Sequence, residues 1–518
     1  MSKTTGFRER THKLIGVNNL ALIGLDVGTT GCKCTIFDAE GNICSYAYRE
    51  YNIISPGTGL FELNPEEVWD AVRFVIGTSV KKHRGEEVTA LCISSFGESA
   101  VPVDRQGKVL YNSILYTDTR GSLQCEQLKY AMGLQNIMEL TGVHAHPMYT
   151  INKVKWFKDN MPEIYKATWK FMLFEDFILF RLGNTAVIDY SLASRTMAFN
   201  VTKKAWEDTI FNAAGIDRDI FSCVAASGTI IGTVSREIAD ELGLPAGVKL
   251  VTGGHDQVCA AIGGGIIKEG RAIDGIGTVE CITPAFDSPV VNKYMLDNNF
   301  ACVPHAKEGM YVTYAFNFTG GSLLKWYRNN FAVAEMLEAQ KSGENAYSIL
   351  DSKAAKQPTD ILVLPHFSGA GTPYMDIAAK GAIIGLSFDV TPGQLYRALL
   401  EGVTYEMMYN MECLGRAGVI INELRAVGGG AKSELWLQLK ADILGKKVVT
   451  LNIDEAGTLG TAILAGTATG VYKSIEEAVD VLVKIKKEFV PDKKNHEIYL
   501  GNYEKYKKIY SRVKEIIS

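Results

Sequence analysis

Apolar positions near the start of the chain form short runs that predict a β-hairpin and a third strand. Residues 20–26 and residues 33–38 are aliphatic runs of strand length, and the turn between them holds glycines and threonines. A second turn, at residues 39–42, leads to another strand over residues 43–51. The chain therefore opens, after a polar segment of residues 1–19, with three consecutive strands.

Capping residues and helical spacing mark the elements that follow. Asn64-Pro-Glu-Glu67 combines an N-cap Asn, Pro at the first helical position and Glu at the third, which predicts a helix to about residue 82. Residues 88–94 follow as a buried strand. At the midpoint, residues 247–252 predict a short strand, and residues 258–262 predict the start of a small-residue helix. Strands that alternate with helices in this way indicate an α/β fold.

Composition places the chain among ordinary soluble globular proteins. It has 518 residues, of which 47% are hydrophobic and 22% are charged, so two domains of about 250 residues are expected. The 54 basic and 58 acidic residues give a net charge of −4, and nothing suggests nucleic acid or a membrane as a partner. No run reaches the ~18 apolar residues of a spanning helix. Scattered cysteines and a polar N-terminus without a secretory signal predict a cytoplasmic protein.

The turn of the first hairpin combines residues that suit a phosphate chain. Asp26 ends the first strand, and Gly28, Thr29 and Thr30 follow it. Glycines let a ligand approach the backbone N–H groups, and threonine hydroxyls add donors. The Asp26 carboxylate suits Mg²⁺, an ion that keeps several of its waters. No GxxxxGK[ST] motif occurs here, so the turn is not a P-loop, and an ordinary Gly-rich turn is the alternative.

The second half of the chain repeats this arrangement. Asp274-Gly-Ile-Gly-Thr278 lies 248 positions after the first hairpin, again between two predicted strands. The repeat predicts duplicated domains that face each other across a nucleotide. Gly428-Gly-Gly430 adds a strand-to-helix turn, where a flat or anionic ligand can lie on bare backbone beside a helix N-terminus.

Two acids stand at strand ends, where open α/β sheets place their ligands. Asp256 lies in Gly253-Gly-His-Asp-Gln257, between the midpoint strand and the helix that follows. Capping of that helix is the alternative role for Asp256, and the two roles are compatible. Glu98 follows the strand of residues 88–94 and is a candidate acceptor for a sugar or polyol hydroxyl, with a solvated turn residue as the alternative.

Taken together and in order, these motifs resemble those of the FGGY carbohydrate kinases, the family of xylulokinase and glycerol kinase, which is built on the actin/Hsp70-type ATPase fold. The similarity extends over about residues 20–515. The motifs that carry it are Gly24-Leu-Asp-Val-Gly-Thr-Thr30, Tyr116-Thr-Asp-Thr-Arg120, Gly254-His-Asp-Gln257, Gly277-Thr278, Ser368-Gly-Ala-Gly-Thr-Pro373, Gly428-Gly-Gly-Ala-Lys-Ser433 and Glu455-Ala-Gly-Thr-Leu-Gly460.

The resemblance implies two ribonuclease H-like domains with a cleft between them. Residues 20–266 would form an N-terminal domain with the sugar site and the catalytic base, and residues 267–518 a C-terminal domain with the nucleotide site. Residues 1–19 would form an N-terminal extension.

The resemblance also implies a role for individual residues. Asp256 would be the catalytic base, Glu98 and Gln257 would contact the substrate, and Asp26 would help to hold Mg²⁺. The implied ATP contacts are Gly28, Thr29, Thr30 and Lys33 at the first hairpin, Gly277 and Thr278 on the γ-phosphoryl side, and Gly429, Gly430 and Ser433 around the adenosine.

The substrate site departs from the family pattern. Phe96-Gly-Glu98 stands where xylulokinase-like members have Gln-Met-His and glycerol kinase-like members have Arg-Glu. Glu98 with Gln257 favours a neutral substrate, because no cation that an acid such as gluconate would require is evident nearby. A ketopentose such as xylulose is therefore expected, and a polyol such as glycerol or erythritol is the alternative.

A chaperone-like or regulatory ATPase of the same fold is the rival from another class of function, since it would share the hairpins. It would not need Glu98 and Gln257 beside Asp256. The sequence leaves the oligomeric state open, a homodimer included.

Overall fold

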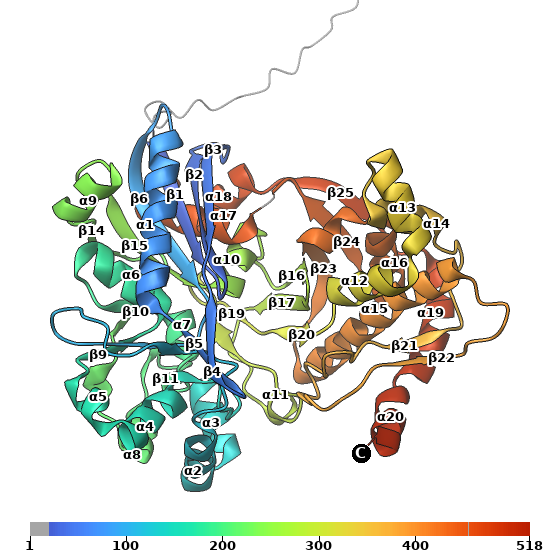
Figure 1. Cartoon of the computed structure of the whole chain (residues 1–518), viewed down its shortest axis with the longest axis horizontal. Coiled ribbons are helices and arrows are strands. Elements are labelled where there is room, and N and C mark those ends of the chain that lie inside the picture. Colours follow the sequence, from blue (N-terminus) through green and yellow to red (C-terminus); the bar gives the residue numbers. More distant parts are fainter. Residues whose placement is uncertain (1–19, 454, 518) are drawn as a thin grey trace, which may run out of the picture.

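The computed structural model describes residues 20–453 and 455–517, so the extension of residues 1–19 lies outside the described residues. Two large mixed sheets, one from each half of the chain, are flanked by helices (Figure 1). This is the α/β architecture that the sequence predicted.

The first sheet has the strand order β3-β2-β1-β6-β15-β14. Its hairpin strands β1 and β2 and the neighbouring β3 are antiparallel, β1, β6 and β15 run parallel, and β14 is antiparallel at the edge. The strands are β1 (Leu20–Val27), β2 (Gly31–Asp38), β3 (Ile43–Glu50), β6 (Glu87–Ser95), β14 (Ile230–Thr233) and β15 (Lys249–His255).

The second sheet repeats this topology. Its hairpin β16–β17 is antiparallel, β16, β23 and β24 run parallel, β25 is antiparallel at one edge, and β20 and β19 both pair with β17. The strands are β16 (Gly270–Ile276), β17 (Glu280–Phe286), β18 (Val303–Pro304), β19 (Tyr311–Val312), β20 (Ala315–Asn317), β23 (Ile421–Val427), β24 (Lys447–Leu451) and β25 (Ile485–Phe489). The duplicated ribonuclease H-like fold is thereby confirmed.

Helices with strong caps pack on the sheets. The Asn64 side chain accepts the Glu66 N–H at the start of α1 (Pro65–Lys82), as predicted, and Thr391 and Gln394 form a capping box at α15 (Pro392–Ala417). The other helices near the sheets and the site are α6 (Phe174–Gly183), α7 (Tyr190–Ser194), α10 (Asp256–Gly263), α12 (Gly321–Phe331), α14 (Ala346–Lys353), the 3₁₀ helix η2 (Gly429–Lys432), α16 (Glu434–Leu444), α17 (Ala456–Ala468) and α18 (Ile475–Leu482).

The remaining strands form small separate sheets, and further helices complete the fold. The helices are α2 (Ser122–Met132), α3 (Leu134–Thr141), α4 (Thr150–Asn160), α5 (Pro162–Ala167), α8 (Asp208–Ala214), η1 (Arg218–Ile220), α9 (Arg236–Leu242), α11 (Lys293–Asp297), α13 (Val333–Ser342), α19 (Lys493–Tyr506) and α20 (Ile509–Ile517). The short strands are β4 (Ile53–Gly57), β5 (Leu60–Leu63), β7 (Val101–Val103), β8 (Ser113–Ile114), β9 (Lys170–Met172), β10 (Val187–Asp189), β11 (Phe199–Asn200), β12 (Ala205–Trp206), β13 (Cys223–Ala225), β21 (Leu362–Leu364) and β22 (Ala382–Ile384).

Helices α10 and α17 join the two halves. They follow the equivalent strands β15 and β24, and they pack against each other. A Cβ atom on Gly263 would lie 1.9 Å from the carbonyl oxygen of Ala456, and one on Gly460 would lie 1.9 Å from that of Cys259. The close approach therefore requires glycine on both helices, which explains the small-residue sequence of α17.

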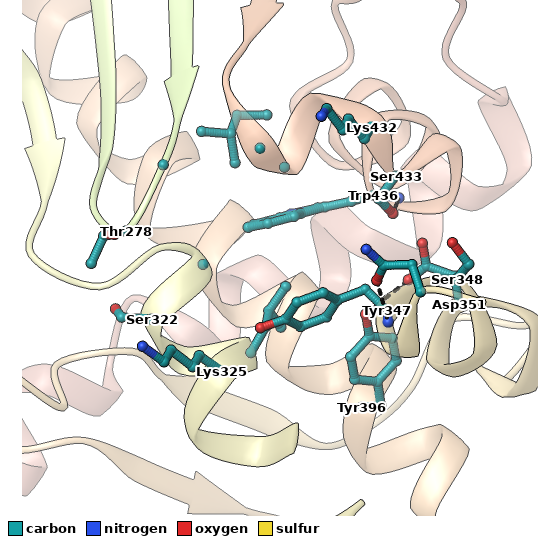
Figure 2. A pocket seen from close by; sticks show the side chains of 17 residues that line it. Thr278, Ser322, Lys325, Tyr347, Ser348, Asp351, Tyr396, Lys432, Ser433 and Trp436 are labelled. Atoms are coloured by element: carbon teal, nitrogen blue, oxygen red, sulfur yellow. Dashed lines mark hydrogen bonds between the residues drawn. The ribbon is translucent and has the colours of Figure 1, made fainter. Parts of the chain in front are cut away.

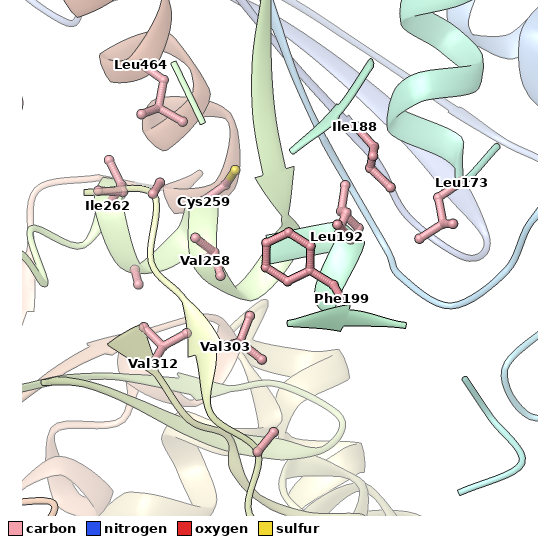
Figure 3. Close-up of a cluster of buried hydrophobic side chains, with 14 of the residues drawn as sticks. Leu173, Ile188, Leu192, Phe199, Val258, Cys259, Ile262, Val303, Val312 and Leu464 are labelled. Atoms are coloured by element: carbon pink, nitrogen blue, oxygen red, sulfur yellow. The ribbon is translucent and has the colours of Figure 1, made fainter. Parts of the chain in front are cut away.

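The apolar core around α10 is continuous across both halves. Val258, Cys259 and Ile262 on α10 are buried together with Leu192 and Phe199 from the first half and with Val303, Val312 and Leu464 from the second half (Figure 3). Because α17 also packs on β1 and β6, a segment of the second half covers the first sheet (Figure 1). The domain division at residue 266 stays a prediction.

The midpoint elements differ in their bounds from the prediction. Strand β15 continues to His255, and α10 begins at Asp256 rather than at residue 258. The strand continues through Gly253 with an irregularity in its pairing to β6, and the Gly253 N–H donates instead to the buried Glu175 carboxylate at 2.7 Å. Among residues 20–453 and 455–517, no helix is long and apolar enough to cross a membrane.

Candidate active site

A cavity of about 270 Å³ lies at the N-terminus of α10, and residues of both halves line it. The first half contributes Asp26, Lys33, Asp256 and Gln257, and the second half contributes Gly275, Gly428 and Glu455. Asp256 is the first residue of α10, and 36% of its side chain is exposed. Its Oδ1 accepts the Gln257 N–H at 2.6 Å, so the carboxylate serves the helix start as well as the cavity.

The surroundings of Asp256 make it a stronger base than an ordinary aspartate. Desolvation in the cavity between the two halves, where the carboxyl is only partly exposed, and next the negative charge of Asp26 raise the pKa of Asp256 to about 7. The Gln257 N–H, Arg195 and Lys33 oppose this rise. An acid with a pKa near neutrality is ionised for much of the time at neutral pH and still accepts a proton readily.

Asp26 lies near the end of β1 and faces the same cavity. Its Oδ1 accepts a hydrogen bond from the Ser94 hydroxyl at 2.5 Å, and its Oδ2 lies 3.4 Å from the Lys33 ammonium. Lys33 also pairs with Glu455 at 2.6 Å. Burial works against the charge of Lys33, but Asp26 and Glu455 outweigh it and raise the pKa of this lysine.

The donor set of this cavity fits a magnesium ion. Three carboxylates, those of Asp26, Asp256 and Glu455, share one lining lysine, Lys33. The excess of negative charge and the oxygen donors suit Mg²⁺, which binds to few carboxylates and retains waters. Asp26 would hold the ion, as the resemblance implied.

The turn residues of the first hairpin lie beyond this lining. Gly28, Thr29 and Thr30 connect β1 to β2, where the Gly28 N–H donates to the Gly31 carbonyl at 2.9 Å. The Tyr51 hydroxyl donates to the Gly28 carbonyl. These two hydrogen bonds fix the backbone of the turn at Gly28, and Thr30 at its tip is exposed.

A second, larger cavity of about 720 Å³ lies between β16, α12, α14 and α16. All of the residues that the sequence assigned to the second hairpin and to the adenosine line it, namely Gly277, Thr278, Gly429, Gly430 and Ser433. A Cβ atom on Gly430 would lie 2.3 Å from the Ile276 side chain, so glycine lets η2 rest on β16. The Ser433 side chain caps α16 by accepting the Trp436 N–H at 3.1 Å.

Several lining residues of the larger cavity were missed from the sequence. Figure 2 shows Trp436 beneath η2, which carries Lys432, with Tyr347 and Tyr396 below it and Lys325 beside Ser322. Lys325, Tyr347 and Tyr396 sit on helices outside the quoted motifs, whereas Lys432 lies within the Gly428–Ser433 motif and Trp436 follows it in α16. Aromatic side chains together with hydroxyls and two lysines in one cavity suit a nucleotide.

The two cavities meet at the glycines before α16. Gly428 lines the smaller cavity, and Gly429 lines the larger one. These adjacent glycines therefore connect the lining of the larger cavity to that of the cavity with Asp26 and Asp256.

Glu98 lies deeper than the sequence predicted and carries a partner. Arg195, just after α7, donates through Nε to the Glu98 Oε1 at 2.6 Å, and its Nη2 pairs with the same oxygen. Both side chains are buried. The expectation that no cation lies near Glu98 was wrong, because Arg195 pairs with it. The sequence could not indicate this pair, since the two residues are 97 positions apart.

Gly97 makes room for that arginine. A Cβ atom at position 97 would lie 2.8 Å from the Arg195 Cγ, so a side chain here would displace it. Glu98 itself has a φ of 66°, a left-handed backbone that is rare for residues other than glycine. Gln257, by contrast, lies directly in the cavity of Asp256.

Two duplicated domains with Gly/Thr hairpins and a shared cleft are the architecture of the actin/Hsp70-type ATPase fold. Sequence models of the FGGY family of carbohydrate kinases match the chain, with the N-terminal domain over residues 21–263 and the C-terminal domain over residues 276–469. The chain therefore belongs to the FGGY family of carbohydrate kinases. It is an ATP-dependent kinase whose acceptor is a hydroxyl group of a sugar or polyol.

Similar proteins cover nearly the whole chain. A xylulose kinase of Staphylococcus epidermidis is 30% identical over 96% of this chain and 97% of its own length. A glycerol kinase of Thermococcus gammatolerans is 31% identical over 91% of this chain and 93% of its own. The crystal structure of a gluconate kinase from Lactobacillus acidophilus has a TM-score of 0.87 at 24% identity and covers 96% of this chain and 98% of that one, which establishes the fold alone.

Proposed function

We propose that the protein transfers the γ-phosphoryl group of ATP to a hydroxyl of a neutral sugar, with a ketopentose such as xylulose as the leading substrate. The observation that carries this proposal is the placement of Asp256, whose pKa is raised to about 7, in a cavity lined by both halves. Relatives named xylulose kinase are 28–30% identical to this chain over 96% of its length.

The proposed chemistry needs positioning more than covalent help. The sugar hydroxyl attacks the γ-phosphorus, a new O–P bond forms, the bond to ADP breaks, and Asp256 takes the hydroxyl proton. Gln257 and Glu98 orient the sugar. Gly28, Thr29, Thr30 and Lys33 face the phosphates from the first half, and Gly277 and Thr278 face them from the second. Gly429, Gly430 and Ser433 hold the adenosine.

Magnesium would be held at Asp26 and would neutralise charge on the phosphate chain. Lys33 stands 3.4 Å from Asp26, so the same carboxylate also orients a cation of the chain itself. These residues place positive charge where negative charge develops during transfer.

A neutral substrate follows from the charge balance around Glu98. Arg195 pairs with Glu98, so the Glu98 carboxylate already balances the positive charge of the guanidinium. An aldonate would have to compete with Glu98 for the guanidinium or leave its own charge unpaired, which is costly in a buried site. A sugar with only hydroxyl groups avoids this cost.

A polyol is the second candidate. Glycerol kinases appear among the relatives at 30–31% identity over at least 91% of this chain. This chain also keeps a glutamate at position 98, the residue type that the resemblance places there in glycerol kinase-like members.

A kinase screen with ATP and Mg²⁺ over pentuloses, hexuloses, polyols and aldonates tests the proposal. The Asp256→Asn protein serves as the blank, so that any contaminating kinase is subtracted. The highest kcat/KM is expected for a pentulose. A preference for glycerol or erythritol would establish the second candidate, and a preference for an aldonate would overturn the neutral-substrate proposal.

The proposed setting is the cytoplasm, with no nucleic acid or membrane as a partner and with a homodimer as the proposed assembly. The net charge of −4 supports the proposal that neither nucleic acid nor a membrane is a partner, since both are anionic. Residues 20–266 and 267–518 are the proposed domains.

A further inference from the structure

His255 stands between the proposed base and a tyrosine of the second half. Its Nε2 lies 3.3 Å from the Asp256 Oδ1, and its Nδ1 lies 3.2 Å from the Tyr314 hydroxyl. Both His255 and Tyr314 are buried. Contacts of this length are at the long end for hydrogen bonds, and catalytic contacts often tighten when substrate binds.

The chemistry of the three groups sets which atom can donate a proton at the Tyr314–His255 hydrogen bond and at the His255–Asp256 contact. Burial, and next Arg195, lower the pKa of His255 to about 3, so the imidazole is neutral and has one donor and one acceptor nitrogen. A carboxylate can only accept, so the proton belongs on Nε2. Nδ1 then accepts, and the Tyr314 hydroxyl must donate to it.

The surroundings hold this arrangement from both sides. The His255 N–H donates to the Ser191 hydroxyl at 2.8 Å, which fixes the backbone of the histidine. The Arg195 guanidinium lies 5.5 Å from the centre of the Tyr314 ring. The charged groups that act on His255 are Arg195 and Glu98, and those that act on Asp256 are Asp26, Lys33 and Arg195.

Tyr314 belongs to the side of the molecule that carries the nucleotide cavity. It directly precedes β20, which pairs with β17, and β17 is the strand that leaves the Gly277-Thr278 turn. Tyr314 is therefore joined through β20 and β17 to the second hairpin, whereas His255 ends β15 of the first sheet and Asp256 begins α10. The contact joins the phosphate side to the sugar side.

We propose that Tyr314 and His255 are positioning residues: Tyr314 fixes the tautomer of His255, and the Nε2–H of His255 holds the Asp256 carboxylate toward the substrate hydroxyl. The orientation of the base then depends on the placement of the second half against the first. The inference rests on the proposed role of Asp256 as the catalytic base.

Two substitutions of His255 separate positioning from packing. In His255→Gln the amide nitrogen can occupy the place of Nε2 and donate to Asp256, whereas the shorter side chain of His255→Asn cannot reach it. We expect the Gln variant to keep kcat within about threefold of the native enzyme and the Asn variant to lose about 10²-fold, the cost of a small misplacement. Nucleotide affinity, measured by calorimetry with ADP, is expected to stay unchanged in both. Equal loss in the two variants would overturn the proposal.

Tyr314→Phe removes the hydroxyl and keeps the ring. We expect kcat to fall about tenfold, the value of one hydrogen bond, with the sugar KM nearly unchanged. In the His255→Gln background, which lacks the acceptor nitrogen, Tyr314→Phe is expected to have no further effect. An equal tenfold loss in both backgrounds would show that Tyr314 does not act through His255 and would overturn its proposed positioning role.

Asp256→Asn, measured in the same assay, distinguishes the two levels of the argument. If it abolishes turnover while the Tyr314 and His255 variants remain fully active, Asp256 is retained as the proposed base, but the proposed positioning by Tyr314 and His255 is overturned. If it retains turnover, the proposed role of Asp256 as the base is overturned, and so is the positioning role that depends on it.

Discussion

The two Gly/Thr hairpins look alike in sequence and do different work in the structure. Asp26 in the first hairpin faces the cavity beside Lys33, whereas Asp274 in the second is fully buried and pairs with the Lys440 ammonium at 2.9 Å. Glu280, also fully buried, is the second partner of Lys440. The Asp26 carboxylate lines a cavity that a ligand can enter. The Asp274 carboxylate is buried and links the hairpin to helix α16 through Lys440.

Strand register explains this difference. Asp26 is one residue before the end of β1, at Val27, and Asp274 is two residues before the end of β16, at Ile276. Successive side chains of a strand point to opposite faces, so a shift by one residue turns the carboxylate from one face to the other. Duplication thus preserved the turn and divided the roles of its acids.

The largest expected effect concerns the buried acids. Lys440→Met leaves Asp274 and Glu280 without their cation, and breaking a buried pair of this kind costs about 3–5 kcal/mol. Unfolding in urea is expected to show this loss. Lys447→Met is the matched control, because Lys447 pairs with Glu423 at the surface and its loss costs about 1 kcal/mol or less. Equal stability of the two variants would contradict the internal role of Lys440.

The next effect concerns the acid that faces the cavity. Asp26→Asn is expected to raise the Mg²⁺ concentration for half-maximal activity about 10–100-fold, as for loss of a residue that holds a metal through water. Asp274→Asn, in which Glu280 still balances Lys440, should leave the Mg²⁺ dependence unchanged. Titration of activity with Mg²⁺ checks both variants, and the same shift in each would erase the distinction between the hairpins.

The smallest effect is a change in pH dependence. Asp256, the proposed base, can accept a proton only when ionised, and its pKa is raised to about 7. The kcat/KM is therefore expected to fall as the pH drops through 7 and to be about tenfold lower at pH 6 than at its plateau. Because the charge of Asp26 contributes to this rise, Asp26→Asn should move the acid limb of the profile to lower pH. Asp274→Asn should not move it. An acid limb unaffected by Asp26→Asn would show that another group controls the profile.

Much of this account was available in the sequence, because hairpins, caps and Gly-rich turns are local features. The first two strands, helix α1 and the duplication were predicted from such patterns, and Gly277, Thr278, Gly429, Gly430 and Ser433 do line one cavity. The family resemblance supplied the proposed catalytic role of Asp256, which neighbouring residues alone left open between capping and catalysis.

Long-range partners were out of reach. Nothing local to Glu98 indicates Arg195, and nothing local to Asp274 indicates Lys440, since each pair is formed only by the folded chain. Gly97 was a departure from the family pattern whose reason appeared only with the Arg195 side chain beside it. The raised pKa of Asp256 likewise depends on burial and on Asp26, which lies on another strand.

The most direct test of the central claim is a comparison of Asp256→Asn with the native enzyme. The substitution keeps the shape of the side chain and removes its basicity. Nucleotide binding, measured by calorimetry, is expected to stay near normal, while kcat for the best sugar falls by ~10²-fold or more. Full retention of kcat would contradict the role of Asp256 as the base.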